Sequence, residues 1–346
     1  MCVTALFEMM NWRDIPVSLS KYRLYYMGCS MLMVVLYHWR CVCAEPLYLR
    51  NFEWGYIGVD VFVFLSGMGL CYAYNKYNLF VFYTRRFLRL YPIYALTAIV
   101  CTLIWSLIHA RFPGLSIWLC ELSGMQSLGM GPFFDWYLSF LFLLYLIFPV
   151  LYRLRHVALV IGLYMLAYMV LSNYIVPWQL SCMISRLYIF VLGMMAYETI
   201  MHRLHVTRLG VLCLCITIAP FVLEIHDRFL LASSFLPVVL LVLYTMHLFL
   251  TVVDKRMLLG KAIDYVGKNS IIVYASNVVS MHSMVFLDPS MNDSLAYWLL
   301  QVVWYIVLYY ANKFLLAPVA AFIVEKVETL VCKLGDEEQM HRQDSH

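Results

Sequence analysis

Charged residues are scarce in this chain: only 13% of its 346 residues are Asp, Glu, Lys or Arg, whereas 64% are hydrophobic. A soluble domain has about 25% charged and about 45–50% apolar residues. So little polar surface cannot cover a water-soluble globule of this length. The composition therefore excludes a cytosolic enzyme, a secreted disulfide scaffold, a disordered protein and a nucleic-acid-binding protein, and it predicts a polytopic membrane protein.

Metal-binding and targeting signals are also missing. The 11 cysteines contain no C-x-x-C pair, and Cys41-Val-Cys43 and Cys213-Leu-Cys215 are spaced too closely for a zinc site. We expect the cysteines to pack in apolar surroundings, and we expect no bound metal. Glu8 interrupts the N-terminal segment, which has no basic region followed by a small-residue cleavage site, so no signal peptide is predicted.

Long apolar runs, rich in aromatic residues (16% of the chain), separate bursts of charge. A bilayer core needs roughly 20 apolar residues per helix. An all-α bundle of about ten transmembrane helices is predicted, with a short break at Pro177 between the fifth and the sixth. The ten expected spans are 24–44, 54–74, 91–110, 136–152, 157–174, 182–200, 209–224, 229–250, 269–287 and 296–323.

The positions of Lys and Arg predict the orientation, because cytoplasmic loops carry an excess of these residues. With the N-terminus inside, 18 of the 24 fall in inside segments and 4 in outside loops, while Arg186 and Lys313 lie within spans. We therefore expect both termini to be cytoplasmic. The expected domains are an N-terminal cytoplasmic segment (1–23), a transmembrane domain (24–324) and a cytoplasmic tail (325–346). The expected location is the cell membrane, in a bacterium the inner membrane.

Ionisable residues within spans are costly and so are functional candidates. His38 lies near the outer end of the first span, Asp60 near the outer start of the second, and Arg186 at a similar depth in the sixth. A carboxylate bonded to one imidazole nitrogen raises the basicity of the other, so His38 and Asp60 are predicted as a catalytic pair. Arg186 is a candidate for binding substrate or an oxyanion. The alternative for His38 is a hydrogen bond between helices.

A basic cluster, Arg85-Arg86-x-x-Arg89, follows the second span, with Pro92 where the next span is expected to start. Arg86 and Arg89 share one helix face and can converge on a phosphate. The alternative is ordinary anchoring at the cytoplasmic surface. Arg23, at the inner end of the first span, lies 15 residues from His38, which is about 22 Å at about 1.5 Å per residue. A long substrate could connect the two ends.

Six blocks of this sequence, in order, resemble the acyltransferase family 3 of integral membrane O-acyltransferases. The GVDVFVFLSG block is quite specific. The blocks are VVLYH (34–38), GVDVFVFLSG (58–67), FYTRRFLRLYP (82–92), WYLSFLFLLYLIFPVL (136–151), SRLYIFVLG (185–193) and GKNSIIVY (267–274).

The resemblance implies transfer of an acyl group, commonly acetyl from acetyl-CoA, to a hydroxyl of a cell-surface or lipid-linked glycan. It maps the family's essential histidine onto His38 and its arginine pair onto Arg86 and Arg89. Acyl-CoA would be a co-substrate, with no permanently bound cofactor; the expected partners are the bilayer, acyl-CoA and the glycan. Three positions depart from the family pattern: Met27 replaces an arginine, Asn277 a histidine, and Leu141 a glutamate of polysaccharide-modifying members.

The same features are compatible with other functions. A transporter or flippase of a glycan-related solute would share the polytopic body, with Asp60, Arg186 and Lys313 lining its path. Its expected signature of paired halves with interrupted helices is not evident in the sequence. A sensing or scaffold role is a third possibility. The sequence names no partner for Lys313, assigns Asn277 to the substrate or oxyanion site, and leaves open whether 111–135 folds as a lid.

Overall fold

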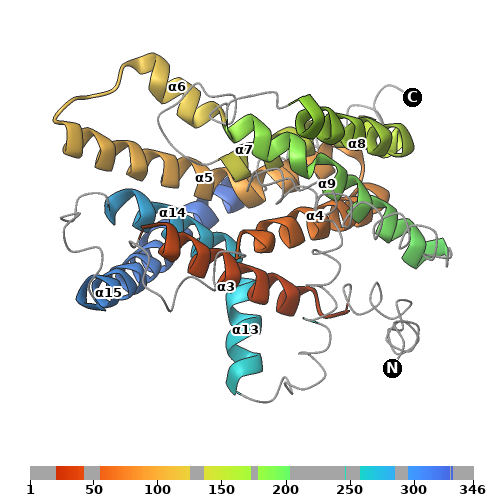
Figure 1. The fold of residues 1–346 in the computed structure, drawn as a ribbon. Helices are drawn as coiled ribbons and strands as arrows, with labels where there is room; N and C mark the ends of the chain where they lie inside the picture. Colours follow the sequence, from red (N-terminus) through yellow and green to blue (C-terminus); the bar gives the residue numbers. More distant parts are fainter. Residues whose placement is uncertain are drawn as a thin grey trace, which may run out of the picture.

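The computed structural model describes residues 21–42, 55–124, 136–172, 178–202, 258–284 and 295–327, together with Met246 and Thr329. Within these ranges the regular elements are helices and there is no strand. The elements are α3 (Arg23–Val42), α4 (Ile57–Lys76), α5 (Leu79–His109), α6 (Leu115–Ser123), α7 (Trp136–Arg153), α8 (Arg155–Ser172), α9 (Trp178–His202), α13 (Leu258–Lys268), α14 (Ser270–Met284), α15 (Leu295–Ala311) and the π-helical η4 (Asn312–Leu316) (Figure 1).

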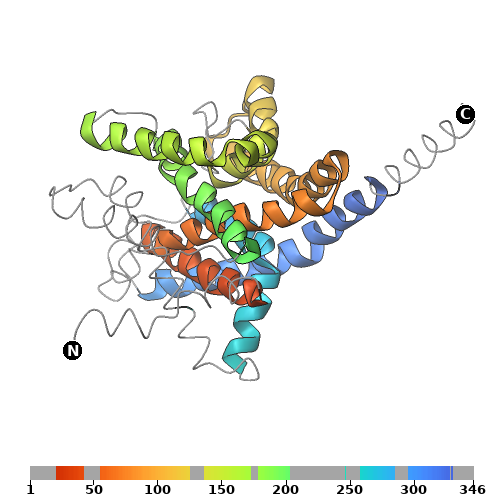
Figure 2. The same ribbon diagram turned by 90° about the vertical axis from the view of Figure 1, so that its right-hand side faces the viewer.

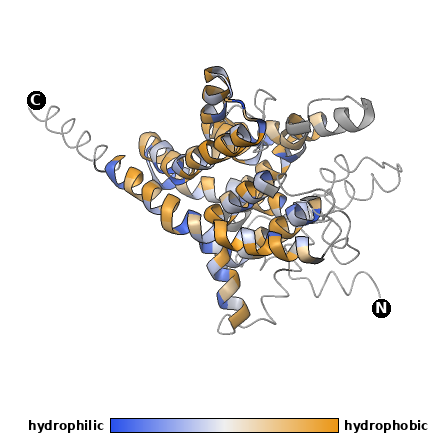
Figure 3. Ribbon diagram, turned by 90° about the vertical axis from the view of Figure 1, so that its left-hand side faces the viewer, coloured by the Kyte–Doolittle hydropathy of each residue, from blue (hydrophilic) through white to orange (hydrophobic). Residues whose placement is uncertain are grey.

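Four of the described helices are long and apolar enough to cross a bilayer: α4, α5, α7 and the continuous helix Leu299–Val327 that contains η4. Hydrophobic residues predominate along the described helices (Figure 3). The all-helical membrane class is therefore confirmed. The count of ten spans and the N-in, C-in orientation stay predictions, and the expected spans 209–224 and 229–250 fall outside the described residues except for Met246.

The start of the third span differs from its prediction. Helix α5 begins at Leu79, where the Asn78 side chain accepts a hydrogen bond from the backbone N–H of Val81 (2.8 Å), and it continues through Pro92 without a break. Proline costs the helix one backbone hydrogen bond, which a transmembrane helix tolerates when neighbours compensate. The basic cluster and the apolar span thus share one 31-residue helix, and the predicted boundary at Pro92 is wrong.

The segment after α5 folds back on it. Ala110 ends α5 in a left-handed conformation (φ 44°), which turns the chain toward α6. Tyr94 of α5 donates a hydrogen bond to the carbonyl of Glu121 in α6 (2.5 Å). Helix α6 is therefore anchored to the side of α5 (Figure 1).

Two glycines set the close packing of α4 on α9. A Cβ added to Gly67 would lie 2.2 Å from the carbonyl oxygen of Phe190, and one added to Gly193 would lie 2.0 Å from that of Phe64. Small residues allow this approach of helix backbones in a membrane, where packing contributes much of the stability. The pair forms the centre of the bundle (Figures 1 and 2). Most of α4 is buried as a result.

Helix α13 crosses α3 steeply, as Figure 1 shows. A Cβ on Gly28 would lie 2.0 Å from the carbonyl oxygen of Ile263, and one on Gly267 would lie 1.8 Å from that of Leu24. Glycine at both positions is what lets the two backbones touch. This contact brings the end of α13 beside the beginning of α3, where the basic residues gather.

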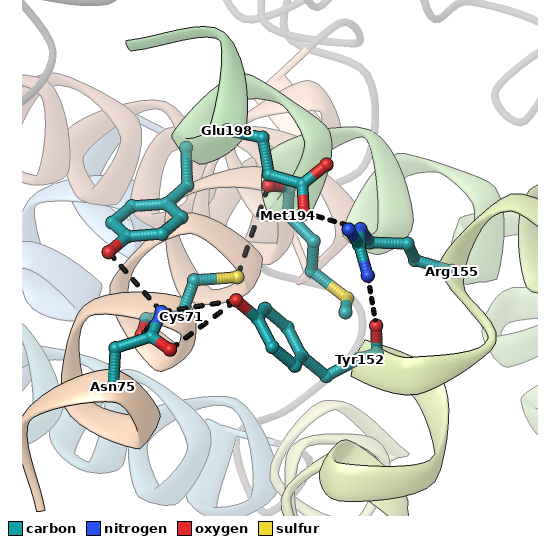
Figure 4. Close-up of polar contacts among 7 residues, drawn as sticks. Cys71, Asn75, Tyr152, Arg155, Met194 and Glu198 are labelled. Atoms are coloured by element: carbon teal, nitrogen blue, oxygen red, sulfur yellow. Dashed lines mark hydrogen bonds and ion pairs between the residues drawn. The ribbon is translucent and has the colours of Figure 1, made fainter. Parts of the chain in front are cut away.

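A polar cluster joins α4, α7, α8 and α9 (Figure 4). Asn75 Nδ2 donates to the hydroxyls of Tyr152 (3.1 Å) and Tyr197 (3.3 Å). Arg155 forms an ion pair with Glu198 (2.5 Å), and its Nη1 donates to the Tyr152 carbonyl (2.8 Å). These groups satisfy one another, so the cluster connects the helix ends without leaving an available charge.

Candidate active site

Three arginines from two helices line one cavity of about 160 Å³. Arg23 comes from the first turn of α3, and Arg86 and Arg89 lie one turn apart on α5. Lys268, at the end of α13, lines the same cavity. The rest of the lining comes from α3, α4, α5, α7 and the α13–α14 region: Leu24, Met27, Met31, Phe62, Leu65, Ser66, Leu90, Tyr137, Leu138, Leu141, Tyr145, Gly267, Ser270, Ile271 and Tyr274.

The backbone of α4 holds two of these guanidiniums in place. Arg23 Nη2 donates to the carbonyl of Leu65, and Arg86 Nη2 to that of Gly69, both at 3.4 Å. A Cβ at position 69 would lie 2.6 Å from Arg23 Nη2. Glycine at position 69 therefore leaves the space that the Arg23 guanidinium occupies.

This cavity has positive charge without a matching acid. Its lining contains four cationic side chains and no Asp or Glu. The guanidiniums of Arg23, Arg86 and Arg89 have no ion-pair partner among the described residues. Like charges held together are unfavourable unless an anion joins them, and arginines favour phosphate in bidentate geometry. The arrangement suits a ligand with several negative charges.

Arg85 does not join this group. It lies on a different face of α5 from Arg86, and its guanidinium carbon is 4.4 Å from the ring centre of Tyr77. Together with Arg89 it lines a second cavity. Neighbouring residues on a helix point about 100° apart, so Arg85 and Arg86 cannot face the same space. The predicted clamp of Arg85, Arg86 and Arg89 is thus divided between two cavities, which share Arg89.

His38 lies in the second half of α3, where it contacts Asn277 of α14. Asn277 Nδ2 of α14 lies 2.7 Å from His38 Nδ1, and the Asn277 side chain is fully buried. The Oδ1 atom of Asn277 has no hydrogen-bond partner among the described residues. The structure therefore brings these two predicted site residues together through their polar side chains.

The predicted pairing of His38 with Asp60 is wrong. Asp60 forms an ion pair with Arg186, with 2.6 Å between Oδ1 and Nε, and the Arg186 side chain also lies 4.9 Å from the ring centre of Trp136. Both charged residues are buried. A buried carboxylate gains more from a guanidinium than from a neutral imidazole, so Asp60 turns to α9 and His38 is left to the amide of Asn277.

The lining of the arginine cavity extends toward His38 along two helices. It reaches Met31 on α3 and Tyr274 on α14. His38 lies seven residues beyond Met31, about 10 Å at about 1.5 Å per residue, and Asn277 lies one turn beyond Tyr274. The lining of the arginine cavity and the His38–Asn277 contact therefore follow one another along α3 and α14.

Lys313, for which the sequence suggested no partner, donates a hydrogen bond to the hydroxyl of Tyr265 in α13. It lies in the π-helical segment η4, and Tyr309 also donates to Tyr265 (2.8 Å). These hydrogen bonds lower the pKa of Tyr265, with Lys313 the largest cause. Lys313 thus connects the helical segment that follows α15 to α13.

Within the described part of the chain, no three His, Cys, Asp or Glu residues are arranged to hold a metal ion. The free cysteines there include Cys71, Cys101 and Cys182, which are buried. The described site therefore offers acid–base and anion-binding groups.

Comparison with known proteins agrees with this reading. A family model described as an acyltransferase domain matches residues 28–324, which include most of the helices described above. The chain is also 36% identical over 112 residues to acyltransferase MdmB of Streptomyces mycarofaciens, although that alignment covers only 29% of each chain. No solved structure matches the chain significantly. The chain therefore belongs to the acyltransferase family 3.

Proposed function

We propose that the protein transfers an acyl group, commonly acetyl, from acyl-CoA to a hydroxyl of a cell-surface or lipid-linked glycan. The observation that carries the proposal is the cavity lined by Arg23, Arg86 and Arg89, whose lining continues along α3 and α14 toward His38. An acyl-CoA has a polyanionic head and a long flexible arm that ends in the thioester. The cavity suits the head, and the helices lead the arm toward the imidazole.

Asn277 determines which nitrogen of His38 is available. If its Nδ2 donates to Nδ1, the ring proton is at Nε2 and neither nitrogen has a free lone pair. If the amide is turned over, its Oδ1 accepts from Nδ1–H and Nε2 becomes free to act as a base. Because Oδ1 is otherwise without a partner among the described residues, turning the amide breaks no other bond of that atom. We assign the second form to the reaction.

The chemistry then needs one base. His38 Nε2 accepts the proton of the acceptor hydroxyl as its oxygen attacks the thioester carbon. The carbon–sulfur bond breaks, the acyl group stays on the acceptor oxygen, and the imidazolium returns the proton to the leaving thiolate. Products are the acyl ester and the free CoA thiol.

Arg186 is not needed for this step. Its charge is matched by Asp60, and its Nη1 donates to the carbonyl of Cys182 (3.1 Å) and to Ser185 (3.3 Å). We therefore assign Asp60 and Arg186 to fixing α4 against α9 rather than to proton transfer or to an oxyanion site.

The test is thiol release by the purified full-length protein in nanodiscs supplied with acetyl-CoA and a membrane glycan extract. We expect His38→Ala to lower the rate of thiol release about 10²- to 10⁴-fold, the usual contribution of a general base. His109→Ala is the matched control, because His109 contacts Trp105 of its own helix and lies outside the cavity. It should retain the wild-type rate.

Mass spectrometry of the glycan completes the experiment. The acceptor should gain one acyl mass with the wild-type protein and none with His38→Ala. A transporter would release no thiol with either protein. Unchanged acylation by a correctly inserted His38→Ala variant would overturn the proposal.

A further inference from the structure

A second cavity, of about 350 Å³, lies where α5, α14 and the last helical segment meet. It is an open cavity and not an enclosed one. Arg85 and Arg89 line it together with apolar residues of all three elements. Those residues are Leu88, Pro92, Ile93, Ile271, Ile272, Ala317, Ala320, Ala321 and Val324.

The two arginines form an anion site at one part of this cavity. They are four residues apart on α5 and so lie on the same helix face, and both are exposed. The lining contains no acidic residue. Neither arginine has an ion-pair partner among the described residues. Two guanidiniums on one face can hold one phosphate through charge-assisted hydrogen bonds.

The remainder of the lining determines the kind of anion. Beyond the two arginines, every lining side chain is apolar, so a ribose, a base or a sugar would leave its polar groups without side-chain partners. Burying such groups unpaired is unfavourable. Methylene groups, in contrast, gain about 0.8 kcal/mol each when they leave water. The cavity therefore favours a phosphate that carries a hydrocarbon chain over a soluble nucleotide.

The surroundings supply such a molecule. The last helix exposes Phe314, Leu315, Val319 and Phe322, each between 47% and 66% exposed, beside the cavity. In a membrane protein these side chains face lipid tails. These side chains neighbour the lining residues Ala317, Ala320 and Ala321 on the same helix, so a lipid chain beside them lies next to the cavity.

We propose that this cavity binds an anionic phospholipid, with its phosphate between Arg85 and Arg89 and one acyl chain against Ile93, Ile271 and Ala320. The proposal does not depend on the identity of the acyl donor. It does make Arg89 a shared residue, because the same side chain lines the arginine cavity. A bound lipid would add negative charge beside the cation cluster.

The experiment is native mass spectrometry of the full-length protein in detergent, titrated with phosphatidylglycerol and, separately, with phosphatidylethanolamine. We expect phosphatidylglycerol to bind about tenfold more tightly, and Arg85→Gln to remove most of that preference. Arg111→Gln is the matched charge control, because Arg111 follows the opposite end of α5, and this variant should keep the preference for phosphatidylglycerol.

The apolar part is tested by filling the cavity. Ala320→Phe places a ring where the acyl chain would lie and should lower phosphatidylglycerol affinity about tenfold. Val319→Phe, one residue away and 47% exposed, should not. Size-exclusion chromatography shows whether Ala320→Phe folds. If it does not, the loss of lipid preference in Arg85→Gln is the test of the proposal.

Inorganic phosphate separates a lipid site from a free anion site. At a concentration far above that of the lipid, it should not displace phosphatidylglycerol. Displacement by phosphate alone, equal binding of the two lipids, or unchanged affinity in both Arg85→Gln and Ala320→Phe would each overturn the proposal.

Discussion

The two ends of α3 lie beside arginines in opposite situations. Near the His38 end, Arg186 is buried and paired with Asp60 at 2.6 Å. Near the Arg23 end, Arg23, Arg86 and Arg89 share a cavity with no acidic residue in its lining. The same residue type is thus neutralised by a carboxylate in one place and has no ion-pair partner among the described residues in the other.

This difference separates structural charge from functional charge. Removing a guanidinium from water is costly unless a partner compensates. At the Asp60–Arg186 pair the partner is part of the fold, so the pair should affect stability. At the arginine cavity the partner has to come from outside, so those residues should affect binding.

The largest expected effect comes from breaking the internal pair. Asp60→Asn leaves the Arg186 charge buried without an opposite charge, which should lower the free energy of unfolding by about 3–5 kcal/mol. Unfolding of the purified protein in mixed micelles measures it. The double variant Asp60→Leu/Arg186→Met is the control and should recover most of the loss, because it removes both charges.

A different outcome would reverse the assignment. If Asp60→Asn unfolded like the wild type but lost its rate of acyl transfer, Asp60 would be part of the catalytic machinery after all.

The next effect should appear in binding. Arg23→Gln and Arg86→Gln should each raise the KM for acyl-CoA about 10- to 100-fold, as expected when a hydrogen bond between charged groups, worth about 1.5–3 kcal/mol, is lost. Their stability should change little, because neither has an ion-pair partner among the described residues. Steady-state thiol release measures the KM.

Arg85→Gln is the matched comparison, since Arg85 lines the other cavity. It should raise this KM less than Arg86→Gln does. Equal effects of the two variants would contradict the division of the basic cluster between two cavities.

Hydropathy and charge were sufficient to predict the helical membrane class and most described helix positions. α3, α4, α7 and α9 lie within a few residues of their predicted spans, because each is limited by charged or turn-forming residues. The start of α5 was missed, since Pro92 looks like a boundary in the sequence. Nothing in the apolar pattern shows that Asn78 caps a helix that runs through it.

Some candidate residues lie together in the structure, but their partners could not be predicted from the sequence. His38 contacts Asn277, and Arg86 and Arg89 line one cavity, yet depth in the membrane could not show that Asp60 faces α9 rather than α3. Helix rotation decides such contacts, and here it depends on close approaches such as that of Gly67 to Phe190.

The departures from the family pattern gain meaning only from the structure. Met27 and Leu141 line the arginine cavity, and Arg23, one turn before Met27, places its guanidinium there instead. The signal for Arg23 was available in the sequence as a shared helix face. Tyr145, Lys268 and the role of Gly69 had no such signal, because they come from other helices or act through the backbone.

A smaller effect is expected at the contact between Asn277 and His38. Asn277→Leu removes the hydrogen bond to His38, so kcat should fall about tenfold while the KM for acyl-CoA stays near the wild-type value. Asn277→His, which keeps a hydrogen-bonding side chain at this position, should retain more of kcat than Asn277→Leu. A purely structural role would change stability and not this split between kcat and KM.

Ser280→Ala is the control on the same helix, because Ser280 is also buried and lies one turn further on α14. It should leave kcat unchanged. If Ser280→Ala and Asn277→Leu lowered kcat equally, general disturbance of α14 would explain both.

The smallest effect is expected at Lys313, where a neutral hydroxyl accepts the hydrogen bond of a cation. Tyr265→Phe should change the free energy of unfolding at pH 7 by about 1 kcal/mol or less, since Tyr265 is 43% exposed and a hydrogen bond contributes only about 0.5–1.5 kcal/mol net. Lys313 lowers the pKa of Tyr265 below its ordinary value of 10.0. A group whose folded-state pKa is lowered contributes its extra stability above the unfolded-state pKa, and that contribution is lost as the pH falls through the folded-state pKa.

Thermal unfolding should therefore show a difference in stability between the wild type and Tyr265→Phe that is small at pH 7 and widens toward pH 10. The control is Tyr310→Phe, on the exposed face of α15, which should follow the wild type throughout. A gap that stayed constant with pH would mean that Lys313 holds Tyr265 by packing and not by charge.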